Sequence, residues 1–429
     1  MKRRRLPLLA LFAADAISVT GNVLALVAVP WFVLELTGSA ALTGITAFFS
    51  ALASLLAAFF GGALVDRVGF RRMSVLADIA SAAAIVAIPI IQLTVGIEPW
   101  QLMILVFLGA LLDAPGTAAR TSMLPDLAEL AGWPIERATG LSQAVRRGAI
   151  LVGAPIAGAL IVIVGTQGVF LIDAVSFLVS AVLIGVLTPA IAYHEPSEEE
   201  EAEAAAELES PRSGRRRYID DLLIGLRFVW KDRLVRAIVL TVMVTNFLDS
   251  PLLGVVLPVY VKEVYGSSVE LGLLFGIFGG AALLGAIGYG MIGQRLPRRL
   301  TFSIAFVIVG LPFWVLALQP PFGIALIAFF VVGLAAGPIN PIISTVIFER
   351  VPRHVRGRVM SSITAAAFVA MPLGMLVFGF ISQQFGVITA IVIIAASYLA
   401  VTLATFVNPA YREMDRPPGG ATTSAPAEA

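Results

Sequence analysis

The sequence predicts an all-α integral membrane protein in which twelve transmembrane helices form two pseudo-symmetric six-helix bundles. Its composition excludes a water-soluble domain, because 59% of the 429 residues are hydrophobic and only 13% are charged. In soluble domains about 45–50% of the residues are hydrophobic and about 25% are charged. Twelve apolar runs give the number of helices, and an internal repeat gives their arrangement.

Each apolar run is long enough to cross a bilayer core of about 30 Å, for which a helix needs roughly 20 residues. Such helices satisfy their own backbone hydrogen bonds, as lipid requires. The first run is expected to be an uncleaved span, because it is too long for a signal peptide and lacks a small-residue cleavage pattern. In chain order the expected spans are about 8–34, 41–64, 73–95, 100–119, 138–163, 169–190, 235–261, 270–293, 300–318, 322–347, 359–382 and 387–407.

The basic residues predict the orientation of these spans. With a cytoplasmic N-terminus, the inner segments carry 28 of the 29 Lys and Arg residues, and the outer loops carry only Lys262. Cytoplasmic loops of membrane proteins are enriched in these residues. We therefore expect a multi-pass protein of the cell (plasma or inner) membrane with both termini in the cytoplasm.

An internal repeat relates the two halves of the chain. Residues 30–72 and 258–300, compared without gaps, share thirteen identities, which include Pro30/Pro258, Glu35/Glu263, Gly38/Gly266, Ser39/Ser267, Gly44/Gly272, Gly62/Gly290, Arg67/Arg295 and Arg71/Arg299. Because six spans return the chain to the same side, the halves are parallel repeats. Parallel repeats with a site between them at mid-membrane are a transporter architecture.

The repeat and the charge pattern set the expected domain boundaries. An N-terminal bundle covers 1–191, and a unit over 219–408 combines an amphipathic helix at the inner surface with the C-terminal bundle. The charged segment 192–218 is expected to be a disordered cytoplasmic linker, or else a regulatory docking segment. A disordered cytoplasmic tail is expected over 409–429.

The loop after the second span contains a lone acid among arginines and glycines. Gly62 permits close helix approach, Gly69 permits a tight turn, and Asp66 can pair with the other half in one conformation only. The loop resembles the signature Gly-x-x-x-Asp-Arg-x-Gly-Arg-Arg of the major facilitator superfamily, with Phe70 inserted. The resemblance implies a conformational switch formed by Gly62, Asp66, Arg67, Gly69, Arg71 and Arg72.

Two further resemblances narrow the family. Gly153, Pro155 and Gly158 in the fifth span resemble the Gly-Pro-rich antiporter motif of proton-coupled exporters, although ordinary tight packing of membrane helices also uses such residues. The stretches 124–127, 170–178 and 225–228 are similar to the third drug:proton antiporter group, which includes macrolide-efflux and enterobactin-exporter-like proteins. The frequent arginine of span four in that group is expected to be missing here.

Polar residues inside the spans are candidates for proton coupling or for lining a cavity, because a charge at mid-membrane costs about 2.5–3.5 kcal/mol on insertion scales. The fold that the resemblance implies brings spans one, four, seven and ten around a central cavity. Arg146 or Arg147 could instead hold Asp15 or Asp113 in a static ion pair. Asp78 and Asp173 lie about a turn from the ends of spans three and six, where solvent can reach them, and we expect structural roles for both. The candidates are Asp15, Asn22, Asp113, Asn246, Asp249 and Asn340.

These features predict a secondary active transporter that works by alternating access and exports hydrophobic, cationic or neutral small molecules in exchange for protons. The alternatives are a dedicated exporter of one natural product, such as a siderophore, and a transport-inactive membrane sensor. We expect no enzymatic activity, because no catalytic cluster and no phosphate-binding Gly-x-x-x-x-Gly-Lys-Ser/Thr loop is present. We also expect a monomer with no cofactor, no metal and no nucleic-acid partner; the proton gradient supplies the energy.

Overall fold

The computed structural model describes residues 5–189, 214–352 and 355–415, apart from the side chains of 58–63, 66 and 214–222. Within that part of the chain, the regular secondary structure is entirely helical. Eleven helical stretches are long and apolar enough to span a membrane. The chain is therefore an all-α membrane protein, as the sequence predicts.

One of these stretches holds two spans. Helix α5 (Ile135–Leu187) has 53 residues, and Gly165 interrupts it with φ 72° and ψ 167°. An unbroken helix of that length would measure roughly 80 Å, more than twice a bilayer core. The left-handed conformation at Gly165 therefore marks the turn between the fifth and sixth spans, and the described residues contain the twelve expected spans.

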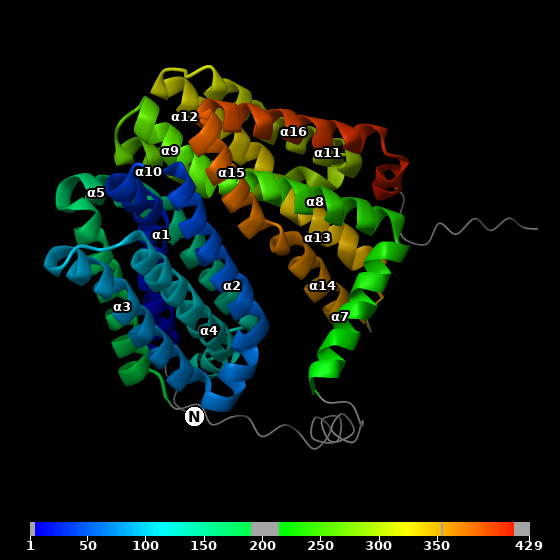
Figure 1. Ribbon diagram of the computed structural model, residues 1–429. Helices are drawn as coiled ribbons and strands as arrows, with labels where there is room; N and C mark the ends of the chain where they lie inside the picture. Colours follow the sequence, from blue (N-terminus) through cyan, green and yellow to red (C-terminus); the bar gives the residue numbers. More distant parts are fainter. Residues whose placement is uncertain (1–4, 190–213, 353–354, 416–429) are drawn as a thin grey trace, which may run out of the picture.

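The N-terminal bundle is formed by five helical elements, drawn in blue to green in Figure 1. They are α1 (Leu6–Thr37), α2 (Ala40–Val68), α3 (Phe70–Thr94), α4 (Pro99–Ala131) and the two-span α5.

The C-terminal bundle has more interrupted helices. Several of its membrane spans are divided into two helical elements by a break inside the span. In chain order the elements are α7 (Gly214–Lys231), α8 (Arg233–Pro251), the π-helical turn η1 (Leu252–Val256), α9 (Leu257–Val264), α10 (Ser268–Ile292), the 3-10 turn η2 (Gly293–Arg295), α11 (Arg298–Ala317), α12 (Phe322–Ala336), α13 (Ile339–Arg350), α14 (Arg356–Val369), α15 (Met371–Phe385), α16 (Val387–Val407) and the 3-10 helix η4 (Pro409–Asp415).

The repeat found in the sequence forms equivalent turns in the two halves. Gly38 ends α1 with φ 63°, and Gly266, which follows α9, has φ 82°. These left-handed conformations carry no steric penalty for glycine. The next residue caps the following helix in both halves, because Ser39 accepts from the backbone N–H of Leu42 and Ser267 from that of Val269. Identical residues at a fixed offset therefore form the same turn twice.

The ends of the described segments differ from the domain boundaries expected from the sequence. Helix α7 begins at Gly214, within the expected linker, while 192–213 and 416–429 lie outside the described residues. The first part of the expected disordered tail is ordered in η4. Tyr411, 1% exposed, donates a hydrogen bond to the carbonyl oxygen of Ala237 and lies 2.7 Å from the Thr241 hydroxyl. An aromatic anchor against α8 therefore fixes Pro409–Asp415.

The two bundles meet along two pairs of helices. α5 packs against α10, and α2 packs against α15. The contacts lie near the turns at Gly38 and Gly266, and in Figure 1 the ribbons of α2 and α14 diverge toward the end of the molecule that carries the N-terminus. We refer to these as the turn end and the N-terminal end. The bundles are therefore in contact at the turn end of the molecule.

Candidate functional site

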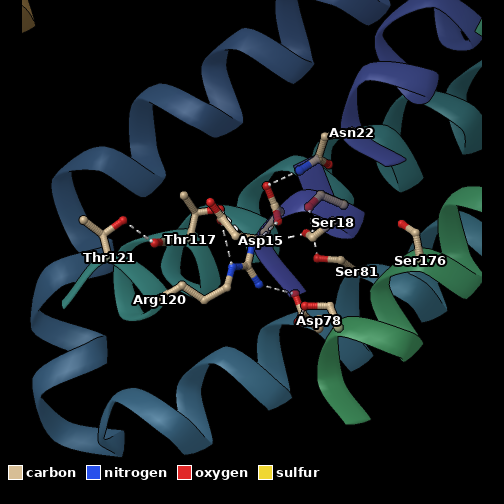
Figure 2. Close-up of polar contacts among 12 residues, drawn as sticks. Asp15, Ser18, Asn22, Asp78, Ser81, Thr117, Arg120, Thr121 and Ser176 are labelled. Atoms are coloured by element: carbon tan, nitrogen blue, oxygen red, sulfur yellow. Dashed lines mark hydrogen bonds and ion pairs between the residues drawn. The ribbon is translucent and has the colours of Figure 1, made fainter. Parts of the chain in front are cut away.

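A network of charged side chains lies inside the N-terminal bundle. The guanidinium of Arg120 on α4 lies 2.8 Å from Asp78 on α3, 3.6 Å from Asp15 on α1 and 3.8 Å from Asp113 on α4. Figure 2 shows Arg120 pointing toward these helices. Its side chain is only 1% exposed, so the four charges form one buried cluster. A buried cation is tolerable only when it is paired and hydrogen-bonded.

Neutral side chains complete this network. Arg120 Nη2 donates to the hydroxyls of Ser18 and Thr117, and Ser180 donates to Asp78 over 2.7 Å. Asn22 donates its amide to Asp113 over 3.1 Å. The first, third and fourth spans are thereby joined, and Ser180 brings in the sixth.

A second arginine reaches the network from α5. Arg146 Nη2 lies 2.8 Å from Asp15 Oδ1. Asp15 is therefore held in an ion pair, which is one of the alternatives that the sequence left open. With all five groups ionised, three carboxylates face two guanidinium groups, and the network of Asp15, Asp78, Asp113, Arg120 and Arg146 carries one net negative charge.

The expectation that span four lacks a buried arginine is wrong. The apolar run of the fourth span ends at about residue 119, directly before the charge of Arg120, but α4 continues to Ala131. Asp113, Thr117 and Arg120 are spaced by four and three residues, so they share one face of the helix. That spacing was visible in the sequence and could have placed Arg120 on the polar stripe.

Two further carboxylates lie deeper than expected. Asp78 and Asp173 are both 0% exposed, although each lies only about a turn from the end of its span as the sequence delimits it. The reason is packing from neighbouring spans, which sequence distance from a span end does not show. Asp78 is bound by Arg120 and Ser180. One carboxylate oxygen of Asp173, Oδ2, has no hydrogen-bond partner among the described residues.

A central cavity of about 890 Å³ lies between the two bundles. Asn22, Asp113 and Asp173 line it from the N-terminal bundle. From the other bundle it is lined mainly by apolar and small residues of α14 and α15, which include Thr364, Phe368, Met371 and Met375. Of the ion network, Asp113 alone is among the lining residues, and it links the cavity to the buried charges.

The other three candidates lie elsewhere. Asn246, Asp249 and Asn340 line a separate cavity of about 190 Å³ within the C-terminal bundle. The resemblance implies instead that spans seven and ten present such residues to the central cavity. Asn246 instead donates its amide to the carbonyl oxygen of Ala367 on α14, a helix whose other residues line the central cavity. The π-helical turn lies beside both cavities, because Leu252 and Leu253 line the smaller one and Gly254 lines the central one.

The antiporter-like motif lies at the contact between the bundles. A Cβ atom at Gly158 would lie 2.4 Å from the backbone oxygen of Ser268, and Ser268 donates its hydroxyl to the Gly158 oxygen over 2.9 Å. On α10, a Cβ atom at Gly276 would lie 2.4 Å from the Pro155 ring. Gly153 instead packs against Val23 of its own bundle. Small residues therefore let α5 and α10 touch at the turn end.

We predict that Gly158→Leu will open the turn end, because no space exists there for a side chain. The chain contains no cysteine, so a single cysteine introduced at Thr364 in the central cavity will report access. Labelling by a membrane-impermeant thiol reagent added on the turn side should increase. Gly148→Leu on the same helix is the matched control, because no atom of the described residues lies within 4 Å of its Cβ position. Equal labelling of both variants would contradict the prediction.

The loop that resembles the signature motif is described in part. Gly69 ends α2 with φ 86° and provides the tight turn into α3. Arg71 donates to the carbonyl oxygen of Gly185 near the end of α5, where helix carbonyls lack partners within the helix. Arg67 and Arg72 are exposed. The side chain of Asp66 and the surroundings of Gly62 lie outside the described residues, so the switch remains a prediction.

Comparison with known proteins identifies the family. The sequence profile of the Major Facilitator Superfamily matches residues 11–282 and 239–428. The chain belongs to this superfamily. The family membership agrees with the twelve spans, the two bundles and the repeat.

Curated members of the superfamily resemble the chain over nearly its whole length. The multidrug efflux pump Tap of Mycobacterium bovis (strain BCG / Pasteur 1173P2) is 33% identical over 415 residues, which cover 96% of each chain. Macrolide efflux protein A of Streptococcus pyogenes is 22% identical over 88% of this chain and 89% of its own. These relatives are transporters rather than enzymes.

Solved structures confirm the major facilitator fold. A crystal structure of the nucleoside transporter NupG superposes with a TM-score of 0.73 at 13% identity and covers 94% of this chain and 98% of its own. The xylose transporter XylE from E. coli gives a TM-score of 0.66 at 15% identity, with 93% and 95% covered. At such identities the likeness concerns the fold alone.

Proposed function

We propose that this protein is a monomeric, proton-coupled exporter of hydrophobic, cationic or neutral small molecules that works by alternating access in the cell membrane. The observation that carries the proposal is the central cavity between the bundles, in which one carboxylate of a buried ion network faces an apolar space. The relatives named multidrug efflux pump and macrolide efflux protein support the cargo class.

The size and lining of the cavity suit such a cargo. Its volume of about 890 Å³ falls within the range of small-molecule sites, about 300–1,000 Å³. Apolar side chains dominate the lining, and the described residues that form it include no Lys or Arg. Arg120 is buried in the N-terminal bundle, where three carboxylates surround it and offset its positive charge. The cavity therefore favours a cation or a neutral molecule over an anion.

The ion network supports proton coupling at Asp113. Among the acids of the network, Asp113 is the one that lines the cavity, its side chain is 19% exposed, and its Oδ1 atom has no hydrogen-bond partner among the described residues. Asp15 and Asp78 are bound by arginines at 2.8 Å. A carboxylate next to the cargo space can exchange a proton when access alternates, whereas tightly paired acids hold the bundle together.

The orientation of the chain in the membrane determines whether the end at which the bundles touch faces the cytoplasm or the outside. We place the N-terminal end in the cytoplasm, because the basic residues gather there. The bundles touch at the opposite end, through α5 with α10 and α2 with α15. This arrangement corresponds to a state that is closed on the outer side.

The decisive experiment is transport in proteoliposomes with an imposed pH gradient and a panel of compounds. We expect several lipophilic cations and neutral amphiphiles to move against their gradients. Transport of one natural product alone would favour a dedicated exporter. Transport that is unchanged when a protonophore collapses the gradient would contradict proton coupling, and a complete lack of transport would favour the sensor.

We predict the topology from the same charge pattern. A reporter fused after residue 205, or at the C-terminus, should be cytoplasmic, and a reporter at Gly38 or Gly266 should be external. Paired alkaline-phosphatase and fluorescent-protein fusions measure this directly. An odd number of crossings between residues 1 and 205 would contradict both the orientation and the parallel repeat.

A further inference from the structure

The cavity inside the C-terminal bundle is unlike the central cavity. It encloses about 190 Å³ and is lined by residues of α8, η1, α10, α11, α12, α13 and α16. Among the described residues that line it, Asp249 is the one acid, and none is Lys, Arg or His. The acids of the N-terminal network are paired with arginines, whereas Asp249 forms no ion pair among the described residues and shares the cavity wall with Tyr398. The carboxylate therefore has no cationic partner within the described chain.

The walls of this cavity are aromatic. Phe306, Phe313 and Phe329 are each at most 4% exposed and line it. Tyr398 packs edge-on against Phe313, with ring centroids 5.3 Å apart. Aromatic faces attract ammonium groups, most strongly where water is excluded. A carboxylate among aromatic rings is an arrangement that binds an organic cation.

Acceptor groups also converge on the cavity. The amide nitrogen of Asn246 donates a hydrogen bond to the Ala367 carbonyl oxygen. The side-chain oxygen of Asn246 is therefore available to accept a hydrogen bond from a ligand. Asn340 lines the cavity from α13. An ammonium group has several N–H donors and no acceptor, and these oxygens together with the Asp249 carboxylate match it.

The backbone beside the cavity is interrupted on two spans. Pro251 ends α8, and the π-helical turn Leu252–Val256 follows, with Leu252 and Leu253 in the cavity wall. Helix α12 ends at Ala336, and α13 begins at Ile339 after Gly337 and Pro338. π-Helical turns and broken membrane helices are frequent at ligand sites. The two helix breaks therefore also indicate a ligand site, and this indication does not depend on the charge of Asp249.

We propose that this cavity is a separate binding site for a small, single-ring organic ammonium ion, with Asp249 as its counter-ion. A cavity of about 150 Å³ holds benzene, so about 190 Å³ accommodates one ring with an aminomethyl group. Cargo of drug size does not fit and remains in the central cavity. The site is independent of the direction and of the coupling of transport.

The test uses the full-length protein in detergent and compares benzylamine with benzyl alcohol by isothermal titration calorimetry. The two probes have nearly the same shape, but only benzylamine is charged at neutral pH. We expect wild-type protein to bind benzylamine about tenfold more tightly than benzyl alcohol, a difference equivalent to about 1.4 kcal/mol. Equal affinity for the two probes would overturn the proposal.

Two variants locate the site. Asp249→Asn keeps the shape and removes the charge, so benzylamine affinity should fall about tenfold while benzyl alcohol affinity stays unchanged. Ala336→Leu fills the cavity and should abolish binding of both probes, with Asp249 intact. If benzylamine binds Ala336→Leu as well as it binds wild type, the ligand lies elsewhere and the proposal is wrong. Proteoliposome transport of larger cargo tests the central cavity separately, so failure of one site is distinguishable from failure of the other.

Discussion

Replacing Asp113 with Asn should abolish cargo accumulation driven by a pH gradient. The amide has nearly the volume of the carboxyl group and cannot ionise, so it imitates the protonated state permanently. Asp113 lies where the buried network meets the central cavity, and its protonation can therefore follow the change of access. Accumulation in proteoliposomes should fall to the level of protein-free liposomes.

Cargo-for-cargo exchange distinguishes a loss of proton coupling in this variant from a loss of its folded structure. Exchange needs no net proton movement, so Asp113→Asn should retain most of it. Glu129→Gln on the same helix is the matched control, because Glu129 is exposed and lies outside the network. Full pH-driven accumulation by Asp113→Asn would show that Asp113 is structural and would move the search for the coupling group to Asp173, Asp15 or Asp66.

Replacing Arg120 with Met should cause the largest loss of stability. Arg120 is 2% exposed, and its contacts extend to Asp15, Asp78 and Asp113. Removal of one partner from a buried ion pair costs about 3–5 kcal/mol, because the remaining charges lose their compensation. The free energy of unfolding, measured by titration with denaturing detergent, should fall by that amount.

A second substitution tests the electrostatic origin of this loss. Adding Asp78→Leu to Arg120→Met removes both members of the 2.8 Å pair, and replacement of both partners by apolar groups is often close to neutral. The double variant should therefore recover much of the stability. Arg146→Gln is the comparison, with an expected loss of about 1 kcal/mol, because its side chain is 26% exposed. Equal losses at Arg120 and Arg146 would contradict a buried network centred on Arg120.

The sequence alone predicted the fold class and several local features. Long apolar runs have one stable solution in lipid, the helix, and thirteen identities at a fixed offset identified the two halves. Turn residues such as Gly38 and Ser39 depend on local backbone conformation, which a pattern of neighbours can show. The spacing of Asp15, Ser18 and Asn22 places them on one face of α1, and that face contacts the ion network.

Only the tertiary structure decided which polar groups meet. Hydropathy ends the fourth span just before Arg120, yet partners on α1 and α3 make the burial of this residue possible. Asp113 and Asp249 looked equivalent in the sequence, but one faces the central cavity and the other a separate aromatic cavity. The rotation of each helix about its axis, and the partners that it meets, depend on packing between distant spans. Hydropathy along the chain determines that a helix crosses the membrane, while contacts between helices determine what its polar residues bind.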